Sequence, residues 1–269
     1  MFIAKNAHNE IIEIEEATKG NDYYCPECKG KLRVRDGEIN VKHFSHESNC
    51  DCDNWGEMSE WHLEWQRKFD KSVREIVLQK DGKKHRADVH MSVKGINLTI
   101  EFQKSSINKP TIRERVEFYS QFGNMIWLFD LSDKNITLEK EYNKLHRFNW
   151  LYPSKSILTP LEFAELNTIV CFQLKDDQIA IPCGVEDNNW KEFYCRKNDL
   201  IHKDEFTQMI KEDYFLKPFN RIKFNKEFLT PHEYYLRRKV ETFLTYAQKN
   251  MIANGTINKE EIISIIQNL

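Results

Sequence analysis

The chain has 269 residues, 40% hydrophobic and 30% charged, which is enough for one large or two modest domains with hydrophobic cores. No run approaches the ~18 apolar residues of a membrane span, and the N-terminus lacks the basic start and apolar stretch of an export signal. The formal net charge of −2 argues against a general polyanion binder but permits a local basic groove. We therefore expect a cytoplasmic protein without membrane contact.

Two β-hairpins are expected near the N-terminus. Residues 2–15 contain two β-rich segments around a turn at 6–9. Residues 31–42 flank Asp36-Gly37, a strong signal for a two-residue turn. That turn would place Leu32 opposite Val41, and the second hairpin would run directly into a His-rich segment.

Four of the seven cysteines cluster after the first hairpin and alternate with two histidines, a pattern typical of metal ligation rather than disulfides in a cytosolic protein. Tetrahedral zinc takes four such ligands from two chain segments. The expected Zn²⁺ ligands are Cys25, Cys28, His46 and Cys50. His43 and Cys52 remain as substitutes. A redox Cys-x-x-Cys pair is the alternative, although such a pair normally lies at a βα junction. Residues 1–56 are thus expected to form a zinc-ribbon or treble-clef-like module.

A helix is expected to begin at Ser59, a good N-cap, and to end near residue 72. Trp61, Trp65 and Phe69 form one apolar stripe on it. His62 lies on the flank of this stripe, where the residues alone favour a half-buried core histidine. A short strand should follow at 75–79.

The segment at residues 86–102 predicts a β-hairpin around Lys94-Gly95. Its register places Asp88 opposite Glu101, with Gln103 on the same face. Like charges directly opposed destabilise a sheet. A divalent cation between the two carboxylates would remove this penalty, and Mg²⁺ favours such a site.

Basic residues stand at both ends of this hairpin: Lys83, Lys84, His85, Arg86, Lys104, Lys109, Arg113 and Arg115. They are either solvated surface charges or the lining of a phosphate-binding groove. A helix is expected from Pro110 to about Gly123, followed by a buried strand at 125–129. The order from Ser59 onward is therefore helix, three strands, helix and strand.

This order, with an Asp on the second strand and Glu-x-Gln on the third, resembles the core of PD-(D/E)XK nucleases. A more specific set of motifs comprises Tyr24–Cys28, Leu32–Arg35, His43–His46 with Cys50, Trp61-His62, Ala87–Val89, Glu101–Ser106, Arg113–Arg115 and Ile126–Leu128. Together these resemble the competence protein CoiA-like family over roughly the first half of the chain. In that family, as here, a glutamine replaces the fold's usual lysine.

The resemblance implies an α/β fold, a mixed α+β sheet with a restriction-endonuclease-like domain at residues 57–150. It implies a metal-dependent DNA nuclease acting on foreign or incoming DNA in competence, recombination or anti-phage defence. Asp88 and Glu101 would bind Mg²⁺ or Mn²⁺, and the implied catalytic residues are Asp88, Glu101, Gln103 and His62. The alternative is a weak or inactive nuclease fold that binds DNA or a partner, since Gln103 cannot carry charge. A third possibility, a structural adaptor protein stabilised by zinc, would leave the pair Asp88 and Glu101 unexplained.

Residues 151–269 carry no visible catalytic motif and form a C-terminal, partly helical α/β region of unknown role. After Asp130 we expect a helix at 139–148, a hairpin at 169–181, a helix at 203–214 and a capped long helix from Thr230. The isoleucine-rich helix after Asn258 would pack on the core, or on a second copy or partner protein.

Overall fold

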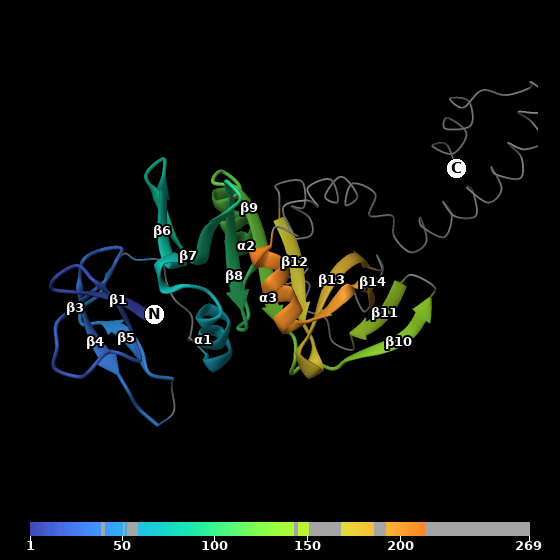
Figure 1. Ribbon diagram of the computed structural model, residues 1–269, viewed down its shortest axis with the longest axis horizontal. Coiled ribbons are helices and arrows are strands. Elements are labelled where there is room, and N and C mark those ends of the chain that lie inside the picture. Colours follow the sequence, from blue (N-terminus) through green and yellow to red (C-terminus); the bar gives the residue numbers. More distant parts are fainter. Residues whose placement is uncertain are drawn as a thin grey trace, which may run out of the picture.

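The computed structural model describes residues 1–38, 41–50, 52, 59–142, 145–150, 168–185 and 192–212 (Figure 1). These residues form a five-stranded sheet and a nine-stranded sheet, with helices on the larger one. No helix in this described part is long and apolar enough to cross a membrane. The fold is the expected mixture of α and β structure, dominated by sheets.

The N-terminal sheet is antiparallel and has the order β2-β1-β3-β4-β5. Its strands are β1 (Ile3–Asn6), β2 (Ile11–Glu13), β3 (Tyr23–Tyr24), β4 (Lys31–Arg35) and β5 (His43–His46). The expected hairpin at residues 2–15 is confirmed, because β1 pairs with β2. The core of this sheet is built from Met1, Phe2, Ala4, Ile14, Ala17, Tyr23, Cys25, Leu32, Phe44 and Leu63.

The second N-terminal hairpin differs from the prediction. Strand β4 pairs with β5, so that Leu32 lies opposite His46 instead of Val41, and Val34 lies opposite Phe44. This register buries Phe44 to 2% exposure, with its ring centroid 5.1 Å from that of Tyr23. Burying such a ring is worth ~1.5–3 kcal/mol, which outweighs the local preference of Asp36-Gly37 for a tight turn.

The large sheet has the order β10-β11-β14-β13-β12-β9-β8-β7-β6. Its strands are β6 (Arg74–Lys80), β7 (Lys83–Val93), β8 (Ile96–Gln103), β9 (Asn124–Asp130), β10 (Ile136–Tyr142), β11 (Leu145–Trp150), β12 (Thr168–Gln173), β13 (Gln178–Val185) and β14 (Glu192–His202). The helices are α1 (Glu60–Arg67), α2 (Lys109–Tyr119) and α3 (Lys203–Lys211), with single 3₁₀ turns at Lys71–Val73 and Lys175–Asp177. The predicted order from Ser59 to Phe129 is confirmed.

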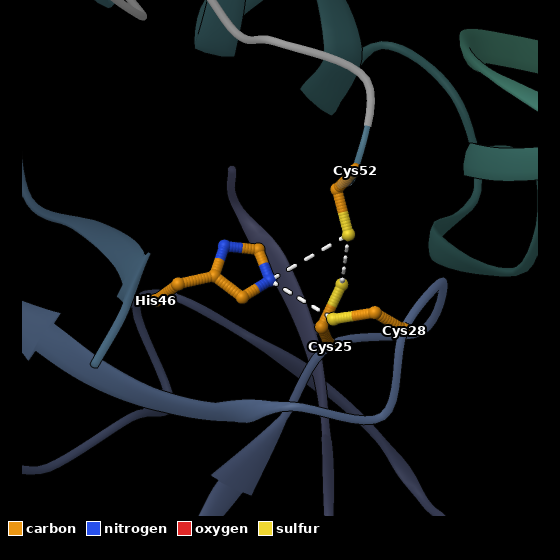
Figure 2. A group of neighbouring side chains, drawn as sticks. All are labelled: Cys25, Cys28, His46 and Cys52. Carbon is orange, nitrogen blue, oxygen red and sulfur yellow. Dashed lines mark hydrogen bonds between the residues drawn. The ribbon is translucent and has the colours of Figure 1, made fainter. Parts of the chain in front are cut away.

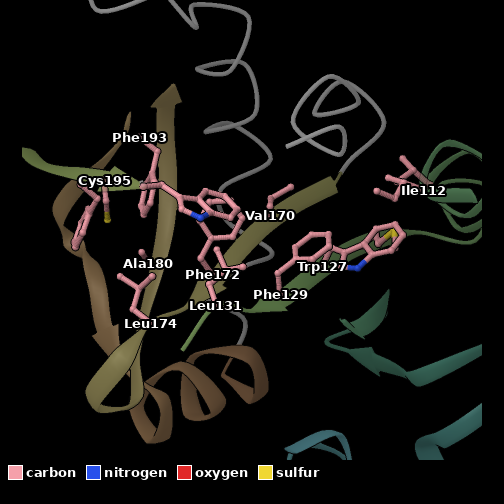
Figure 3. Packing of buried hydrophobic residues seen from close by; sticks show 14 of the residues in the cluster. Ile112, Trp127, Phe129, Leu131, Val170, Phe172, Leu174, Ala180, Phe193 and Cys195 are labelled. Atoms are coloured by element: carbon pink, nitrogen blue, oxygen red, sulfur yellow. The ribbon is translucent and has the colours of Figure 1, made fainter. Parts of the chain in front are cut away.

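The helices cover both faces of the large sheet. The apolar side of α2 packs in one cluster with Trp127 and Phe129 of β9, and this cluster continues through Phe172 to Phe193 (Figure 3). Helices α1 and α3 belong to the cluster on the other face. Strand β9 is buried along its whole length, as its continuous apolar run predicts.

The predicted turn at Lys94-Gly95 is confirmed, and Val89 pairs with Ile100 as the register requires. Both turn residues have positive φ, 49° and 80°, as a type I′ turn needs. Past Val89 the carboxylate of Asp88, instead of a main-chain oxygen, accepts the Phe102 N–H at 2.8 Å. The Asp88 side chain therefore lies at the point where the two strands begin to separate.

The second half of the chain extends the same sheet. The helix expected at residues 139–148 is wrong, because β10 and β11 form an antiparallel hairpin there. The alternating burial of β11, with Phe148 and Trp150 inward, explains why a strand forms. The hairpin at 169–181 and helix α3 are confirmed. Strand β12, which follows residue 150, pairs with β9 and so belongs to the same sheet as the strands before residue 150. The helices expected after Thr230 lie outside the described residues.

Helix α1 lies between the two sheets (Figure 1). Its Leu63 belongs to the core of the N-terminal sheet, whereas its tryptophans pack on the large sheet. Arg67 on α1 forms an ion pair with Glu15 of the N-terminal module. The buried carboxylate of Glu75 on β6 accepts the N–H of Phe2 at 2.7 Å. The N-terminal module is thus attached directly to the elements that carry the candidate site.

Candidate functional site

Four sulfur and nitrogen ligands converge in the N-terminal module (Figure 2). Cys25 and Cys28 follow strand β3, His46 ends strand β5, and Cys52 lies six residues beyond it. Their ligand atoms all lie within 4.8 Å of one another. The Cys25 and Cys52 sulfurs are 3.7 Å apart, and the Cys28 sulfur is 3.3 Å from Nε2 of His46. A tetrahedral zinc site with Zn–S bonds of ~2.3 Å needs sulfur–sulfur distances of ~3.8 Å. The cluster could therefore bind a structural metal ion such as zinc.

The fourth member of the cluster is Cys52, where the spacing of the sequence favoured Cys50. Cys50 is exposed and is not one of the four converging side chains. His46 is the last residue of a strand, so the chain must reverse before it offers another ligand, and the longer spacing to Cys52 allows this. The other substitute, His43, has its Nδ1 atom 2.7 Å from the carbonyl oxygen of Val41.

The thiols of this cluster have unequal acidity. Burial raises the pKa of Cys28, but hydrogen bonds from the Gly30 N–H and from the Cys52 and Cys25 thiols hold it below its ordinary value. Burial raises the pKa of Cys25, and the buried guanidinium of Arg86 only partly offsets this rise. Binding a metal ion would therefore require proton loss from the Cys25 thiol, whose pKa is raised.

The second candidate site lies where β7 and β8 separate. Asp88 on β7 and Glu101 on β8 are both buried. One Asp88 oxygen, Oδ2, accepts the Phe102 N–H. The other, Oδ1, lies 2.8 Å from Nε2 of His62 and accepts a hydrogen bond of 3.3 Å from the Gln66 side chain. Both carboxylate oxygens of Asp88 are thus oriented by protein groups.

Helix α1 delivers His62 and Gln66 to Asp88 from consecutive turns. The hydroxyl of Ser59 caps the helix by accepting the His62 N–H at 3.3 Å. Burial lowers the pKa of His62, but the charge of Asp88 and the hydrogen bond to it raise the pKa above its ordinary value overall. His62 is therefore a partner of Asp88 and not the core histidine that its position alone favoured.

The opposite flank of α1 is fixed by the second half of the chain. The indole N–H groups of Trp61 and Trp65 both donate to Oε1 of Gln173 at 2.7 Å. Gln173 is buried at the end of β12. Gln173, which lies more than 100 positions away in the sequence, therefore helps to determine how α1 faces Asp88.

Glu101 has a basic partner from the other helix. Nη1 of Arg115, on α2, donates to Oε2 of Glu101 at 2.7 Å. The apolar positions Ile112, Val116 and Tyr119 hold α2 against the sheet, which turns Arg115 toward the end of β8. Each buried acid is thus matched with a base from a separate helix.

Gln103 lies at the end of β8 but its amide is directed into the following loop. Nε2 of Gln103 donates to the carbonyl oxygen of Ser105 at 2.8 Å and to its hydroxyl at 3.0 Å. Lys104, the residue directly after β8, pairs with Asp130 at 2.9 Å. Gln103 therefore lies two residues after Glu101 in the sequence, but its amide donates to Ser105.

Three residues at this site were not predicted as members of it. Gln66 could have been found, because it follows His62 by four residues and so shares its helix face. Arg115 was noted as one of many basic residues and as part of the Arg113–Arg115 motif, but without a role beside the acids. Gln173 has no signal in the sequence, since its role depends on long-range packing of β12 beside β9.

The acidic site fits a hard divalent cation in its chemistry. Asp88 and Glu101 supply buried carboxylate oxygens on neighbouring strands. Mg²⁺ and Mn²⁺ prefer such donors and usually keep water or phosphate as further ligands. The His62 and Arg115 contacts mean that a bound ion would have to share or replace the present partners of the carboxylates.

Comparison with known proteins yields two family matches, one to the N-terminal module and one to the region that begins within α1. The family model "Competence protein CoiA, N-terminal domain" matches residues 6–54, and "Competence protein CoiA, nuclease-like domain" matches residues 64–181. Together these spans cover more than half of the chain. Competence protein CoiA of Bacillus subtilis (strain 168) is 27% identical over 146 residues, which cover 51% of this chain and 39% of that protein. The chain thus spans well under two thirds of that relative, and no solved structure matches.

Proposed function

Because this chain belongs to the competence protein CoiA family, which has a nuclease-like domain, we propose that it is a metal-dependent DNA nuclease. Its substrate would be foreign or incoming DNA, in competence, recombination or anti-phage defence. The observation that carries the proposal is the pair Asp88 and Glu101, two buried acids on adjacent strands of the nuclease-like domain. Keeping two buried carboxylates charged is costly, and a bound divalent cation would offset that cost.

In this proposal Asp88 and Glu101 hold Mg²⁺ or Mn²⁺, which when bound supplies an activated water and positive charge for the phosphate oxygens. His62 keeps Asp88 oriented through the contact at Oδ1 and can move a proton at Nε2. Gln66 supports the same oxygen. Gln103 can only orient water or a phosphate oxygen, and to do so its amide must leave Ser105.

DNA is the proposed partner, and basic side chains around the hairpin would bind its phosphates. Lys83 and Lys84 are exposed at the start of β7, and Lys109 and Arg113 are exposed on α2. Such contacts give salt-dependent affinity without sequence preference. The zinc ion proposed for the Cys/His cluster would be structural and would hold the N-terminal module against α1 and β6.

A second candidate function is DNA or partner binding without cleavage. It is favoured by the Gln103 amide, which bonds to Ser105, and by the engagement of both acids with basic groups. It is disfavoured by the burial of two carboxylates that binding alone does not need.

The deciding experiment incubates the zinc-loaded protein with double-stranded, single-stranded and branched DNA and with RNA, with and without Mn²⁺. The test variant is Glu101→Gln, and the matched control is Glu117→Gln at an exposed position of α2. We expect Mn²⁺-dependent cleavage of DNA that Glu101→Gln lowers by at least about 100-fold and Glu117→Gln leaves unchanged. Full cleavage by Glu101→Gln would overturn the site, and binding of DNA without any cleavage would support the second candidate.

A further inference from the structure

The guanidinium group of Arg115 forms an ion pair with Glu101, one of the two carboxylates that would hold the metal ion in the proposed function. Arg115 donates to Oε2 of Glu101 at 2.7 Å, and the exposed fractions of the two side chains are only 15% and 6%. Arginine stays protonated at all relevant pH values, so the pair is ionic and persistent. The interaction therefore neutralises Glu101 in the absence of a metal ion.

A divalent cation and this guanidinium cannot both bind the same carboxylate without repulsion. The repulsion is strong here because the site is buried and poorly screened. Arg115 has a long side chain anchored on a rigid helix, and Ile112 and Val116 fix that helix on the sheet. Its head group can therefore move while its Cα stays in place.

We propose that Arg115 has two successive roles: it holds Glu101 while the site lacks metal, and it moves to the scissile phosphate once the metal binds. This inference rests on the proposed nuclease function and extends it. A guanidinium matches the oxygens of a phosphate in a bidentate way. Arg115 thereby supplies the positive charge that Gln103, in place of a lysine, does not. It would be a catalytic residue that also opposes metal binding.

This role gives a signature that a purely structural ion pair does not. Removing a competing cation raises the affinity of Glu101 for metal, whereas removing a structural partner lowers it or leaves it unchanged. Removing a phosphate ligand lowers kcat even when metal saturates the site. Tighter metal binding together with slower cleavage thus identifies both roles.

The experiment measures Mn²⁺ affinity by titration calorimetry and kcat at saturating Mn²⁺, on protein whose zinc cluster is saturated with Zn²⁺. The variants are Arg115→Gln and Arg115→Lys, with Glu117→Gln on the exposed side of α2 as the matched control and Glu101→Gln as the site control. We expect Arg115→Gln to bind Mn²⁺ about tenfold more tightly and to cleave about 100-fold more slowly. Arg115→Lys should keep an affinity near wild type, and Glu117→Gln should change neither quantity by much.

Unchanged or weaker Mn²⁺ binding by Arg115→Gln overturns the inference. Should that variant fail to fold, the Arg115 side-chain N–H signal of the wild-type protein gives a second measurement by NMR, with Arg115→Lys used for its assignment. It should shift on addition of Mg²⁺ in the wild-type protein and stay fixed in Glu101→Gln, and no shift in either overturns the inference. If wild-type and Glu101→Gln proteins bind Mn²⁺ equally, the proposed nuclease site itself fails, which is a distinct outcome.

Discussion

His62 on α1 and Asp88 on β7 form a partly buried contact in which Nε2 of the histidine lies 2.8 Å from Oδ1 of the aspartate. The two residues come from a helix and a strand that the sequence separates by a 3₁₀ turn and strand β6. The contact is possible because Trp61 and Trp65 pack the adjacent side of the helix onto the large sheet. The orientation of the Asp88 carboxylate therefore depends on the position of α1.

The first prediction concerns the pH dependence of this contact. The pKa of His62 is raised in the folded protein, so the stability that it contributes is fully present below its ordinary pKa and is lost as pH rises through the folded value. His62→Gln should therefore cost about 1.5–3 kcal/mol of unfolding free energy at acidic pH and less at alkaline pH. Urea unfolding without Mn²⁺ or Mg²⁺ at about pH 6 and pH 8.5 measures this difference. His8→Gln, in an exposed turn, is the control, and a pH-independent cost at His62 would contradict the prediction.

The second prediction tests whether Gln66 faces a site that prefers positive charge. Its side chain is fully buried and its Nε2 donates to Asp88. Gln66→Glu would place a like charge beside Asp88 and should destabilise the protein by about 3–5 kcal/mol without divalent metal. Saturating Mn²⁺ should restore much of this loss, because a cation would bind the added carboxylate as well. Thermal unfolding with and without Mn²⁺ measures both effects. Glu64→Gln, exposed on the same helix, should show neither, and a loss that Mn²⁺ leaves untouched would argue against a cation site.

Local features explain which parts of the site could be predicted from sequence. Lys94-Gly95 specifies its turn by backbone conformation, and the alternation around it specifies which side chains share a face. Asp88 and Glu101 therefore lie near each other for reasons contained in one hairpin. Their charge partners could not be placed in the same way, because Arg115 belongs to a helix whose orientation depends on packing against β9.

Competition between local turn preference and tertiary packing explains where the N-terminal module differs from the prediction. Asp36-Gly37 favours a tight turn, but the register that forms buries Phe44 against Tyr23. In this structure His46 is the last residue of β5, and Cys52 instead of Cys50 lies in the cluster.

The third prediction separates the two cysteines. Cys52→Ser removes one of the four converging ligand atoms, whereas Cys50→Ser changes an exposed side chain beside the cluster. Losing a zinc ligand should weaken zinc binding by more than about 100-fold, a larger effect than losing a residue that only supports a ligand. Zinc content after dialysis against a weak chelator, measured by atomic emission, reports the change. Retention of zinc by Cys52→Ser and its loss from Cys50→Ser would reverse the ligand assignment.

The fourth prediction concerns Gln173, which joins the second half of the chain to α1. Its carbonyl oxygen accepts the indole N–H of both Trp61 and Trp65. Gln173→Met keeps the volume but leaves two buried donors without this acceptor, and should cost about 1–3 kcal/mol for each of them.

The conservative variant Gln173→Glu keeps acceptor oxygens and should lose less stability than Gln173→Met, although it adds charge near Asp177. Tryptophan fluorescence and urea unfolding report the two variants side by side. Because α1 carries His62, the Gln173→Met protein should also lose part of the pH dependence that the His62–Asp88 contact produces. A Gln173→Met variant with wild-type stability and an unchanged pH profile would show that apolar packing alone positions the helix.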